Sequence, residues 1–355
     1  MIADPVFIVG TERSGSNLLR LLLNELPDIA VPHPPHLMRD LSKLEHTYGD
    51  LRNEVNFRRL AGDAVRLVEL HFAPWPVRLE VDRVVRHSPK RDLYSVYAAI
   101  YELFRMHSGA ARWGCKSTFM IHHVRHVLDH HERPQFIHLV RDVRDVAVSA
   151  RKSVFCHYHP YFVAKLWKRE QQLAITWAQR LAADTWLTLR YEDLIRDPHN
   201  EMRRVCGFLG SRYTDDLLKF FEKPAARELS ALSRSWQNVS RPVLQNNSGK
   251  FRSELSQSDI RIIESAARQA MEQFGYVLFS KSEELDGSPN LLTRTRYLLE
   301  EEWMMLKEES RALFLDKNAR FRLKRKAYLW WLNWRWRGVT SAAEVSRKSL
   351  SGHCP

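Results

Sequence analysis

Short apolar runs alternate along this chain with segments whose apolar residues recur every three or four positions. The runs at 6–9 and 136–140 predict buried strands, and the repeats at 14–26, 143–153 and 161–183 predict helices. Alternation of this kind predicts an α/β fold, a mostly parallel central sheet flanked by helices. Ligands bind such sheets at the carboxyl ends of the strands, so the polar turns that follow the strands are the first places to look for chemistry.

The remaining segments follow the same two patterns. Helical repeats lie at 52–72, 92–106 and 122–131, strand-like runs lie in "RWGCKS" and "TWLTLRYEDL", and "PDIAVPHPPH" is a proline-rich loop. Ser256, followed three residues later by Asp259, predicts the N-cap of a helix that ends at Gly275.

Composition and charge narrow the class of protein. Of 355 residues, 44% are hydrophobic and 27% are charged, as in ordinary globular proteins. No apolar run approaches the roughly 18 residues of a spanning helix, and the N-terminus lacks the features of a secretory signal. The wide spacing of the four cysteines favours neither a disulfide framework nor a zinc site, which makes a cytoplasmic location the simplest interpretation; they are Cys115, Cys156, Cys206 and Cys354.

The formal net charge of +13 fits three partners: nucleic acid, an anionic membrane surface or an acidic small ligand. The sequence contains no zinc-finger spacing, basic zipper or aromatic RNA-binding signature, so nucleic acid is not expected.

A polar turn, "GTERSGSN", separates the first predicted strand from the first predicted helix. Such a turn points backbone N–H groups and the positive end of the helix dipole at one spot, and Gly15 lets an anion approach the backbone closely. Ser14, Ser16 and Asn17 add side-chain donors, and Arg13 adds a permanent positive charge. The turn therefore predicts a phosphate site, with an ordinary Gly/Ser turn as the alternative. A nucleoside triphosphate fits this turn less well, because Ser16 stands where P-loop nucleoside triphosphatases have their lysine.

A second polar segment, "LVRDVRDVAVSARKS", follows the strand at 136–140. Arg141 at the strand end and Ser149 in the next helix can both bond a phosphate, the arginine through charge-assisted hydrogen bonds. Arg144, one turn into the helix, is a further candidate. The alternative is that Arg141 forms a structural ion pair with Asp142.

These two segments resemble the phosphate motifs of sulfotransferases that use 3′-phosphoadenosine 5′-phosphosulfate (PAPS), of the bacterial type with a P-loop-like fold. The resemblance implies that Arg13 contacts the bridging oxygen and the sulfonate, while 14–17 cradle the 5′-phosphate. It also implies that Arg141 and Ser149 bind the 3′-phosphate.

Three later segments extend the resemblance over about 6–276. "WGCKST" is similar to the family's Gly-x-Lys-Thr step and implies that Lys116 approaches the transferring group. "LRYEDL" implies that Tyr191 lies near the adenine. "NNSGKFRSELS" resembles the loop that closes on the 3′-phosphate, matched in kind by Gly249 and Lys250, with phenylalanine where tryptophan is usual.

The sequence departs from the family at two functional positions. Leu18 stands where cytosolic members have the tryptophan that stacks on adenine, and Pro34 stands where many relatives have an acidic base. In-line sulfuryl transfer removes a proton from the acceptor, which suits a histidine of near-neutral pKa. We nominate His36 first and His33 second as the base, with a surface or turn histidine as the alternative. Weaker candidates are Glu12, His122 and His123. Positive charge on Arg13 and Lys116 would stabilise the leaving phosphate.

The composition changes from about Pro289, which predicts a sulfotransferase domain over 1–285 and a helical, basic, tryptophan-rich extension over 286–355. In this extension four tryptophans interleave with two arginines: Trp330, Trp331, Trp334, Trp336, Arg335 and Arg337. One hypothesis is contact with an anionic membrane surface and a lipid or glycolipid acceptor. The other, slightly favoured because the tryptophans fall on several sides of a helix, is packing on the catalytic domain or a second subunit with solvated arginines.

The sequence therefore predicts a cytoplasmic, PAPS-dependent sulfotransferase that needs no metal and releases 3′,5′-ADP. The acceptor would be a hydroxyl or amine of a small molecule, glycan or lipid. The alternatives are a P-loop-type nucleotide kinase or NTPase, and a non-catalytic protein that binds a membrane surface or a polyanion.

Overall fold

The computed structural model describes residues 4–153, 157–232, 234–281, 285, 289–315 and 319–350, with side chains for 234, 235 and 336–350 left out of the description. The chain forms two compact units. Unit 1 comprises Met1–Pro34 and Ser108–Lys317, and unit 2 comprises Pro35–His107 and Asn318–Pro355. The predicted domain boundary at residue 285 stays a prediction. Cys115 and Cys206 are buried free thiols, whereas Cys156 and Cys354 lie outside the described residues.

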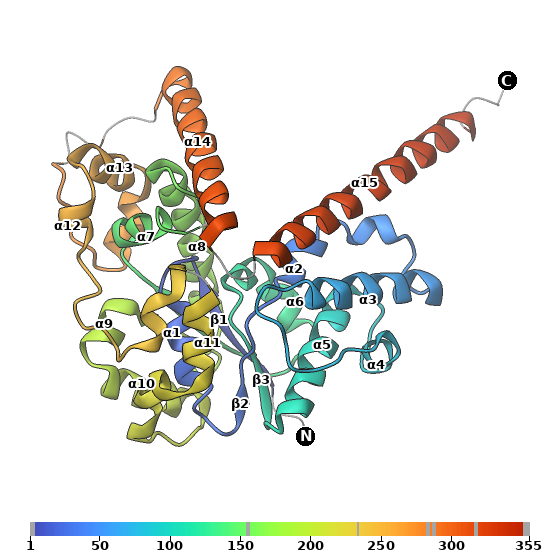
Figure 1. The fold of residues 1–355 in the computed structure, drawn as a ribbon, viewed down its shortest axis with the longest axis horizontal. Helices are drawn as coiled ribbons and strands as arrows, with labels where there is room; N and C mark the ends of the chain where they lie inside the picture. The colour runs from blue at the N-terminus through green and yellow to red at the C-terminus, as the bar shows by residue number, and fades with distance from the viewer. Residues whose placement is uncertain are drawn as a thin grey trace. The chain divides into compact units, whose positions relative to one another are not determined.

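A five-stranded parallel sheet, ordered β2-β3-β1-β4-β5, lies at the centre of unit 1 (Figure 1). The strands are β1 Val6–Gly10, β2 Ile29–Ala30, β3 Arg112–Cys115, β4 Gln135–Val140 and β5 Trp186–Arg190. β1 and β4 pair in register from Val6 opposite Gln135 to Gly10 opposite Leu139. Their continuous apolar runs are buried, as expected for strands covered on both faces. The predicted α/β fold is confirmed.

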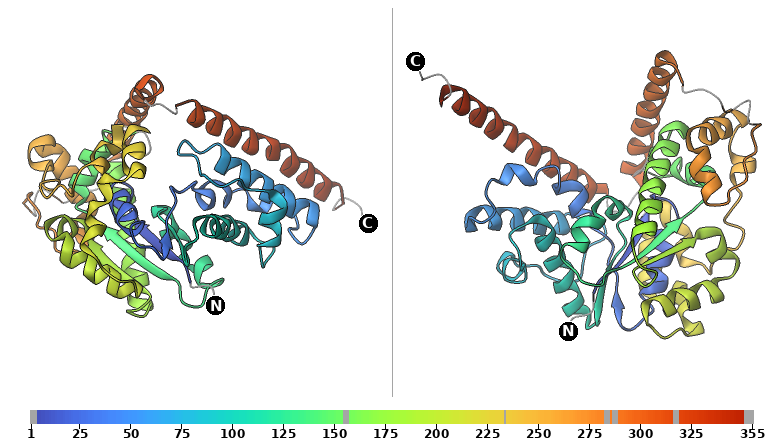
Figure 2. Two further views of the ribbon diagram at one scale, coloured as in Figure 1. Left: turned by 60° about the horizontal axis from the view of Figure 1, so that its bottom comes forward. Right: turned by 180° about the vertical axis from the view of Figure 1, so that it is seen from behind.

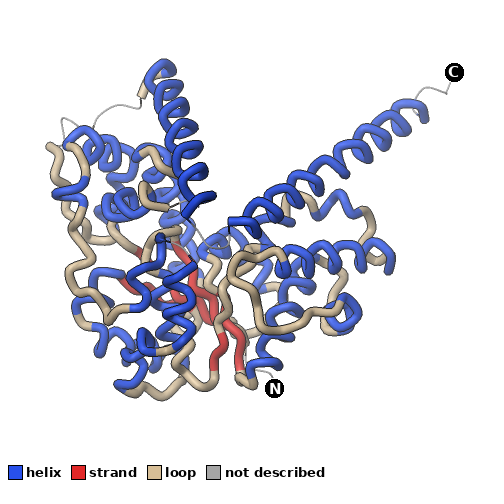
Figure 3. Tube along the Cα trace, viewed as in Figure 1, coloured by secondary structure: helices blue, strands red, loops and turns tan. Residues whose placement is uncertain are grey.

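Helices surround this sheet in unit 1, as Figure 3 shows with strands in red and helices in blue. They are α1 Ser16–Leu23, η2 Thr118–His123, α6 Val124–Leu128, α7 Val143–Ala150, α8 Pro160–Arg180, α9 Tyr191–Arg196, α10 Pro198–Leu209, η3 Asp215–Glu222, α11 Pro224–Leu232, η4 Arg234–Ser240, α12 Phe251–Glu254, α13 Gln257–Gln273 and α14 Leu291–Leu315. α7, α8 and α13 share an apolar core around the fully buried Trp167. The predicted cap of α13 is a capping box between Ser256 and Asp259, and Gly275 follows the helix with φ 72°.

Unit 2 is helical, and Figure 2 shows its elements from two further sides. It contains α2 Leu37–Leu41, η1 Glu45–Tyr48, α3 Glu54–Glu69, α4 Val81–Arg86, α5 Leu93–Ser108 and α15 Ala319–Leu350. Asn53 caps α3 by accepting a hydrogen bond from the Val55 amide at 2.9 Å. Within the described ranges of the chain, each helix is too short or too polar to cross a membrane.

Candidate active site

The turn between β1 and α1 contains two residues whose backbone lies in the left-handed region, Arg13 and Gly15. Gly15 has φ 93°, and a Cβ added there would lie 2.3 Å from the Tyr191 ring, so a side chain at this position would clash. Arg13 also lies in the left-handed region, with φ 70°. α1 begins at Ser16 with no acidic residue in its first turn and no side-chain cap, which leaves the positive end of its dipole facing the turn. The turn has the features of an anion site.

The second predicted motif lies against this turn, because β1 and β4 are neighbouring parallel strands that end at the same edge of the sheet. Arg13 Nε donates a hydrogen bond to Ser149 Oγ at 3.0 Å. Arg141 Nη1 donates to the Arg13 carbonyl at 3.2 Å, and its guanidinium carbon lies 4.4 Å from the centre of the Tyr191 ring. The structure thus brings together Arg13, Gly15, Arg141, Ser149 and Tyr191.

The loop at 246–256, "NNSGKFRSELS", contacts these residues through two side chains that the sequence did not single out. Arg141 Nη2 donates to the Asn247 carbonyl at 2.8 Å, and Lys250 Nζ donates to Asn247 Oδ1 at 2.6 Å. Asp145, on α7, accepts a hydrogen bond from the Gly249 amide at 2.6 Å. Asn247 and Asp145 therefore hold Gly249 and Lys250 beside the two phosphate motifs. Both residues lie inside the quoted motifs, but their partners Gly249 and Arg141 are about a hundred residues away in the sequence, so the motifs alone did not indicate these roles.

Lys116 follows β3 and is 8% exposed. Burial, and next the neighbouring Arg20, lower the pKa of Lys116 to about 7. Arg20 is itself buried and donates to the Val31 carbonyl at 3.2 Å; burial lowers its pKa to about 10. Two buried cations near each other raise the energy of the charged lysine, which a bound anion would offset.

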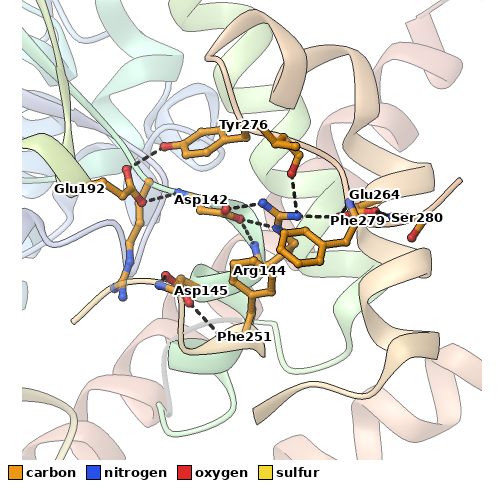
Figure 4. Close-up of polar contacts among 12 residues, drawn as sticks. Asp142, Arg144, Asp145, Glu192, Phe251, Glu264, Tyr276, Phe279 and Ser280 are labelled. Carbon is orange, nitrogen blue, oxygen red and sulfur yellow. Dashed lines mark hydrogen bonds and ion pairs between the residues drawn. The ribbon is translucent and has the colours of Figure 1, made fainter. Parts of the chain in front are cut away.

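Arg144 proves to be structural rather than a phosphate ligand (Figure 4). Its guanidinium is buried, with 2.6 Å contacts to both Asp142 and Glu264. It also packs 4.1 Å from the centre of the Phe251 ring, the residue that replaces the family's usual tryptophan. Because Asp142 pairs with Arg144, the alternative ion pair between Arg141 and Asp142 is wrong.

Glu192 connects the "YED" segment to the end of β4, as Figure 4 also shows. Its carboxylate accepts hydrogen bonds from the Asp142 amide and from the Tyr276 hydroxyl, both at 3.0 Å. These bonds fix the chain next to Tyr191 and Arg141, which flank Glu192 and Asp142 in sequence. Leu18, in α1, is half-buried.

The two nominated bases fall in different units. His33, in unit 1, is buried with its ring centroid 5.0 Å from that of Trp236. His36, in unit 2, precedes α2 with φ 54°, a conformation that histidine adopts only at some cost. Asp40, in α2, is the carboxyl nearest to His36 in the sequence. It pairs with Arg325 at 2.7 Å.

α8 carries a buried carboxyl that the sequence did not single out. Glu170, in α8, is 3% exposed, and its Oε1 lies 3.5 Å from His122 Nε2. Burial raises the pKa of Glu170. Its neighbour Gln171 donates to Thr11 Oγ1 at 3.0 Å. In the sequence, Glu170 and Gln171 are two polar residues within the apolar pattern of a long helix. Periodicity alone does not show whether such residues are buried or exposed.

A shallow, water-sized hollow lies beside the turn. It combines polar groups of the turn with apolar side chains of α7 and α8, and its lining residues are Thr11, Glu12, Arg13, Val146, Ala150, His157, Val163 and Leu166.

Comparison with known proteins identifies the family. The sequence matches the Sulfotransferase family over residues 5–215. The fold is similar to the sulfotransferase domain of the Synechococcus PCC 7002 olefin synthase, with TM-score 0.51 and 22% identity over 78% of this chain and 96% of that domain. It is also similar to the sulfotransferase domain from the curacin biosynthetic pathway, with TM-score 0.54 and 18% identity over 78% of this chain and 98% of that domain. No curated protein matches. Because the family match spans more than half of the sequence, and the fold agrees with it, the chain belongs to the sulfotransferase family.

Proposed function

We propose that this protein transfers a sulfuryl group from PAPS to a hydroxyl or amine of an acceptor. The observation that carries the proposal is the hydrogen bond between Arg13 Nε and Ser149 Oγ, at 3.0 Å. It joins the turn after β1 to the helix after β4, so both motifs that would hold a nucleotide with two separate phosphate groups meet at one edge of the sheet.

The residues at this edge fit an anionic donor. Ser14 Oγ and Arg141 Nε are buried and make no hydrogen bond to any group in the described part of the chain. Buried polar atoms are normally bonded, so these two are available to phosphate oxygens. Lys116 and Lys250 add positive charge on the flanking segments. In our proposal Arg141, Ser149, Gly249 and Lys250 hold the 3′-phosphate, the turn at 13–17 holds the phosphosulfate, and Tyr191 and Leu18 lie toward the adenine.

The proposed reaction breaks the bond between sulfur and the bridging oxygen and forms one between sulfur and the acceptor atom. The acceptor proton passes to a base, for which His36 is the first candidate and His33 the second. The 5′-phosphate of the product gains negative charge, which Arg13 and Lys116 stabilise. Much of the catalysis is then positioning and charge stabilisation, as in phosphoryl transfer.

The donor site can be tested by calorimetry with 3′,5′-ADP. Arg141→Ala removes charge-assisted bonds and should weaken binding by about 10- to 100-fold, and Ser149→Ala, which removes a neutral bond, by about 3- to 10-fold. Arg133→Ala is the matched control, because Arg133 precedes β4 at its other end and pairs with Asp184 on the surface. Binding of ATP with magnesium in place of 3′,5′-ADP would support a kinase or NTPase instead.

Transfer itself needs a second experiment. We would supply radiolabelled PAPS with phenol, saccharide, lipid and peptide acceptors and measure labelled product. The proposal expects transfer to one acceptor class that falls with Arg141→Ala and not with Arg133→Ala. Tight 3′,5′-ADP binding without transfer to any class would indicate a donor-binding protein that is not an enzyme.

A further inference from the structure

The C-terminal helix α15 is anchored to unit 2 along one face. Arg325 donates hydrogen bonds to the carbonyls of Leu67 and Pro35 and to Asp40 Oδ2, the last at 2.7 Å. Leu332, two turns further along, is fully buried. These contacts hold the helix on the unit by side chains that all point the same way.

The second anchor is Asp63, in α3. Tyr328 Oη and Arg335 Nη2 each donate to its carboxylate at 2.6 Å, and Tyr48 donates to it at 2.7 Å. The anchoring positions on α15 are therefore 325, 328, 332 and 335, spaced as one face of a helix. The expectation that Arg335 is solvated is wrong, because the arginine pairs with a buried carboxylate.

The opposite face of α15 presents tryptophan to solvent. Leu323, Trp330 and Trp334 are 51%, 69% and 62% exposed. At 3.6 residues per turn, these three side chains lie about 140–180° around the helix from Arg325. Trp331 differs, because it stacks on Tyr328 with ring centroids 5.4 Å apart and an interplanar angle of 29°. The exposed tryptophans are thus held outward by the anchors on the other side.

The charge around this face is of one sign. Residues 319–335 contain six basic residues and no acidic one. Arg320, Lys324 and Lys326 are exposed and flank the apolar strip. Tryptophan beside lysine and arginine on a fixed helix face is the pattern of a helix that lies in the interface of an anionic membrane.

Two other occupants fit the face less well. A second copy of the chain would bring an identical strip of positive charge against the first, and the repulsion would oppose pairing. Single-stranded nucleic acid binds in positively charged grooves where bases stack, whereas these tryptophans lie on the outward side of a single helix. An anionic lipid surface satisfies both the charge and the shape.

We propose that the outward face of α15, defined by Leu323, Trp330 and Trp334 with the flanking Arg320, Lys324 and Lys326, binds the surface of a membrane that contains anionic phospholipid. The tryptophans enter the boundary between headgroups and acyl chains, and the basic side chains contact lipid phosphates. The helix lies on the membrane and does not span it, in agreement with its many charged residues. This inference does not depend on the sulfuryl-transfer reaction.

Vesicle flotation of the full chain tests the proposal. Wild-type protein should float with vesicles of phosphatidylcholine and phosphatidylglycerol, and much less with phosphatidylcholine alone. The double variant W330S/W334S should bind the anionic vesicles at least about tenfold more weakly, since both interfacial side chains are removed. The matched control is Trp303→Ser, which removes a tryptophan that is 68% exposed in α14, next to acidic residues.

A second variant separates charge from apolar insertion. K324Q/K326Q should lower binding to the anionic vesicles and make it less sensitive to salt, with little effect on pure phosphatidylcholine. Unchanged thermal unfolding and 3′,5′-ADP binding by W330S/W334S would show that the fold survives, as expected for side chains outside the anchoring face.

Four results would overturn the proposal. The first is that wild-type protein fails to float with anionic vesicles, and the second is that W330S/W334S floats as well as wild type. The third is that vesicles remain unbound while light scattering shows a concentration-dependent dimer that W330S/W334S turns into a monomer. In that case the face pairs two copies of the chain. Retention of a single-stranded oligonucleotide without vesicle binding would overturn it in the same way.

Discussion

The buried lysine after β3 predicts how donor binding depends on pH. Lys116 has a pKa of about 7 because burial, and then Arg20, disfavour its charged form. A bound phosphate or phosphosulfate supplies the negative charge that the protonated lysine lacks. Binding should therefore move the pKa of Lys116 back up, and above pH 7 the complex should take up a proton that the free protein does not carry.

The size of the effect follows from this shift. If the bound anion restores the ordinary lysine pKa of 10.5, affinity for 3′,5′-ADP falls nearly tenfold per pH unit above pH 7. From pH 6 to pH 9 the loss is about 100-fold, or ~2.7 kcal/mol. The free energy of unfolding of the ligand-free protein depends on pH in the opposite direction. The unfolded lysine keeps its proton up to about 10.5, so the free energy of unfolding should rise as pH increases from 7 toward that value.

Titration calorimetry at several pH values, in buffers with different ionisation enthalpies, measures both the affinity and the number of protons taken up. Lys116→Met should bind more weakly at pH 6 and lose most of the pH dependence between 7 and 9. Lys116→Arg, which stays charged over this range, should also lose it. Proton uptake near zero at pH 8 in the wild type, or a slope that survives in Lys116→Met, would refute the reasoning.

Three further substitutions test other parts of the site. Gly15→Ala places a Cβ 2.3 Å from the Tyr191 ring at φ 93°, so 3′,5′-ADP binding should weaken by at least about tenfold; unchanged calorimetric affinity would show that the turn does not hold the donor. Glu264→Gln replaces the charge-assisted bond from the buried Arg144 by a neutral one, while Asp142 still pairs with the arginine, and should lower the free energy of unfolding by about 1–3 kcal/mol in urea denaturation; an unchanged value would contradict this role. Glu170→Gln should flatten the pH dependence of the free energy of unfolding above about pH 4.5, because burial raises the pKa of Glu170 in the folded protein and its ionisation there lowers stability; an unchanged pH dependence in urea denaturation would contradict this.

Sequence reasoning succeeded where the information was local. The apolar run at 136–140 and the cap at Ser256 need only their own neighbours to form, and both appear as predicted in β4 and α13. The two phosphate motifs were also readable, because each follows a strand whose direction fixes the edge of the sheet where it lies. Their contact through Arg13 and Ser149 needs only that the two strands be neighbours.

It failed where long-range contacts decide the structure. β2 has two residues inside the proline-rich loop, and it is a strand only because Ile29 and Ala30 pair with Arg112 and Trp113. No periodic signal is possible in two residues. The sequence could not distinguish Glu170 from the exposed polar residues of the same helix, because its burial depends on elements far away in the sequence, including His122.

The same limit explains why the sequence could not rank Arg141 and Arg144 as ligands. Both are arginines within one turn of the end of β4, and the difference lies in what each meets. Arg144 reaches Glu264, 120 residues later, and Asp142, so two carboxylates more than neutralise its charge. Arg141 donates to two carbonyls, of Arg13 and Asn247, which carry no net charge. Its Nε makes no hydrogen bond to any group in the described part of the chain and is left for an anion at this edge of the sheet. A donor atom that the fold leaves unbonded, rather than the identity of the side chain, distinguishes the candidate ligand from the structural residue three positions away.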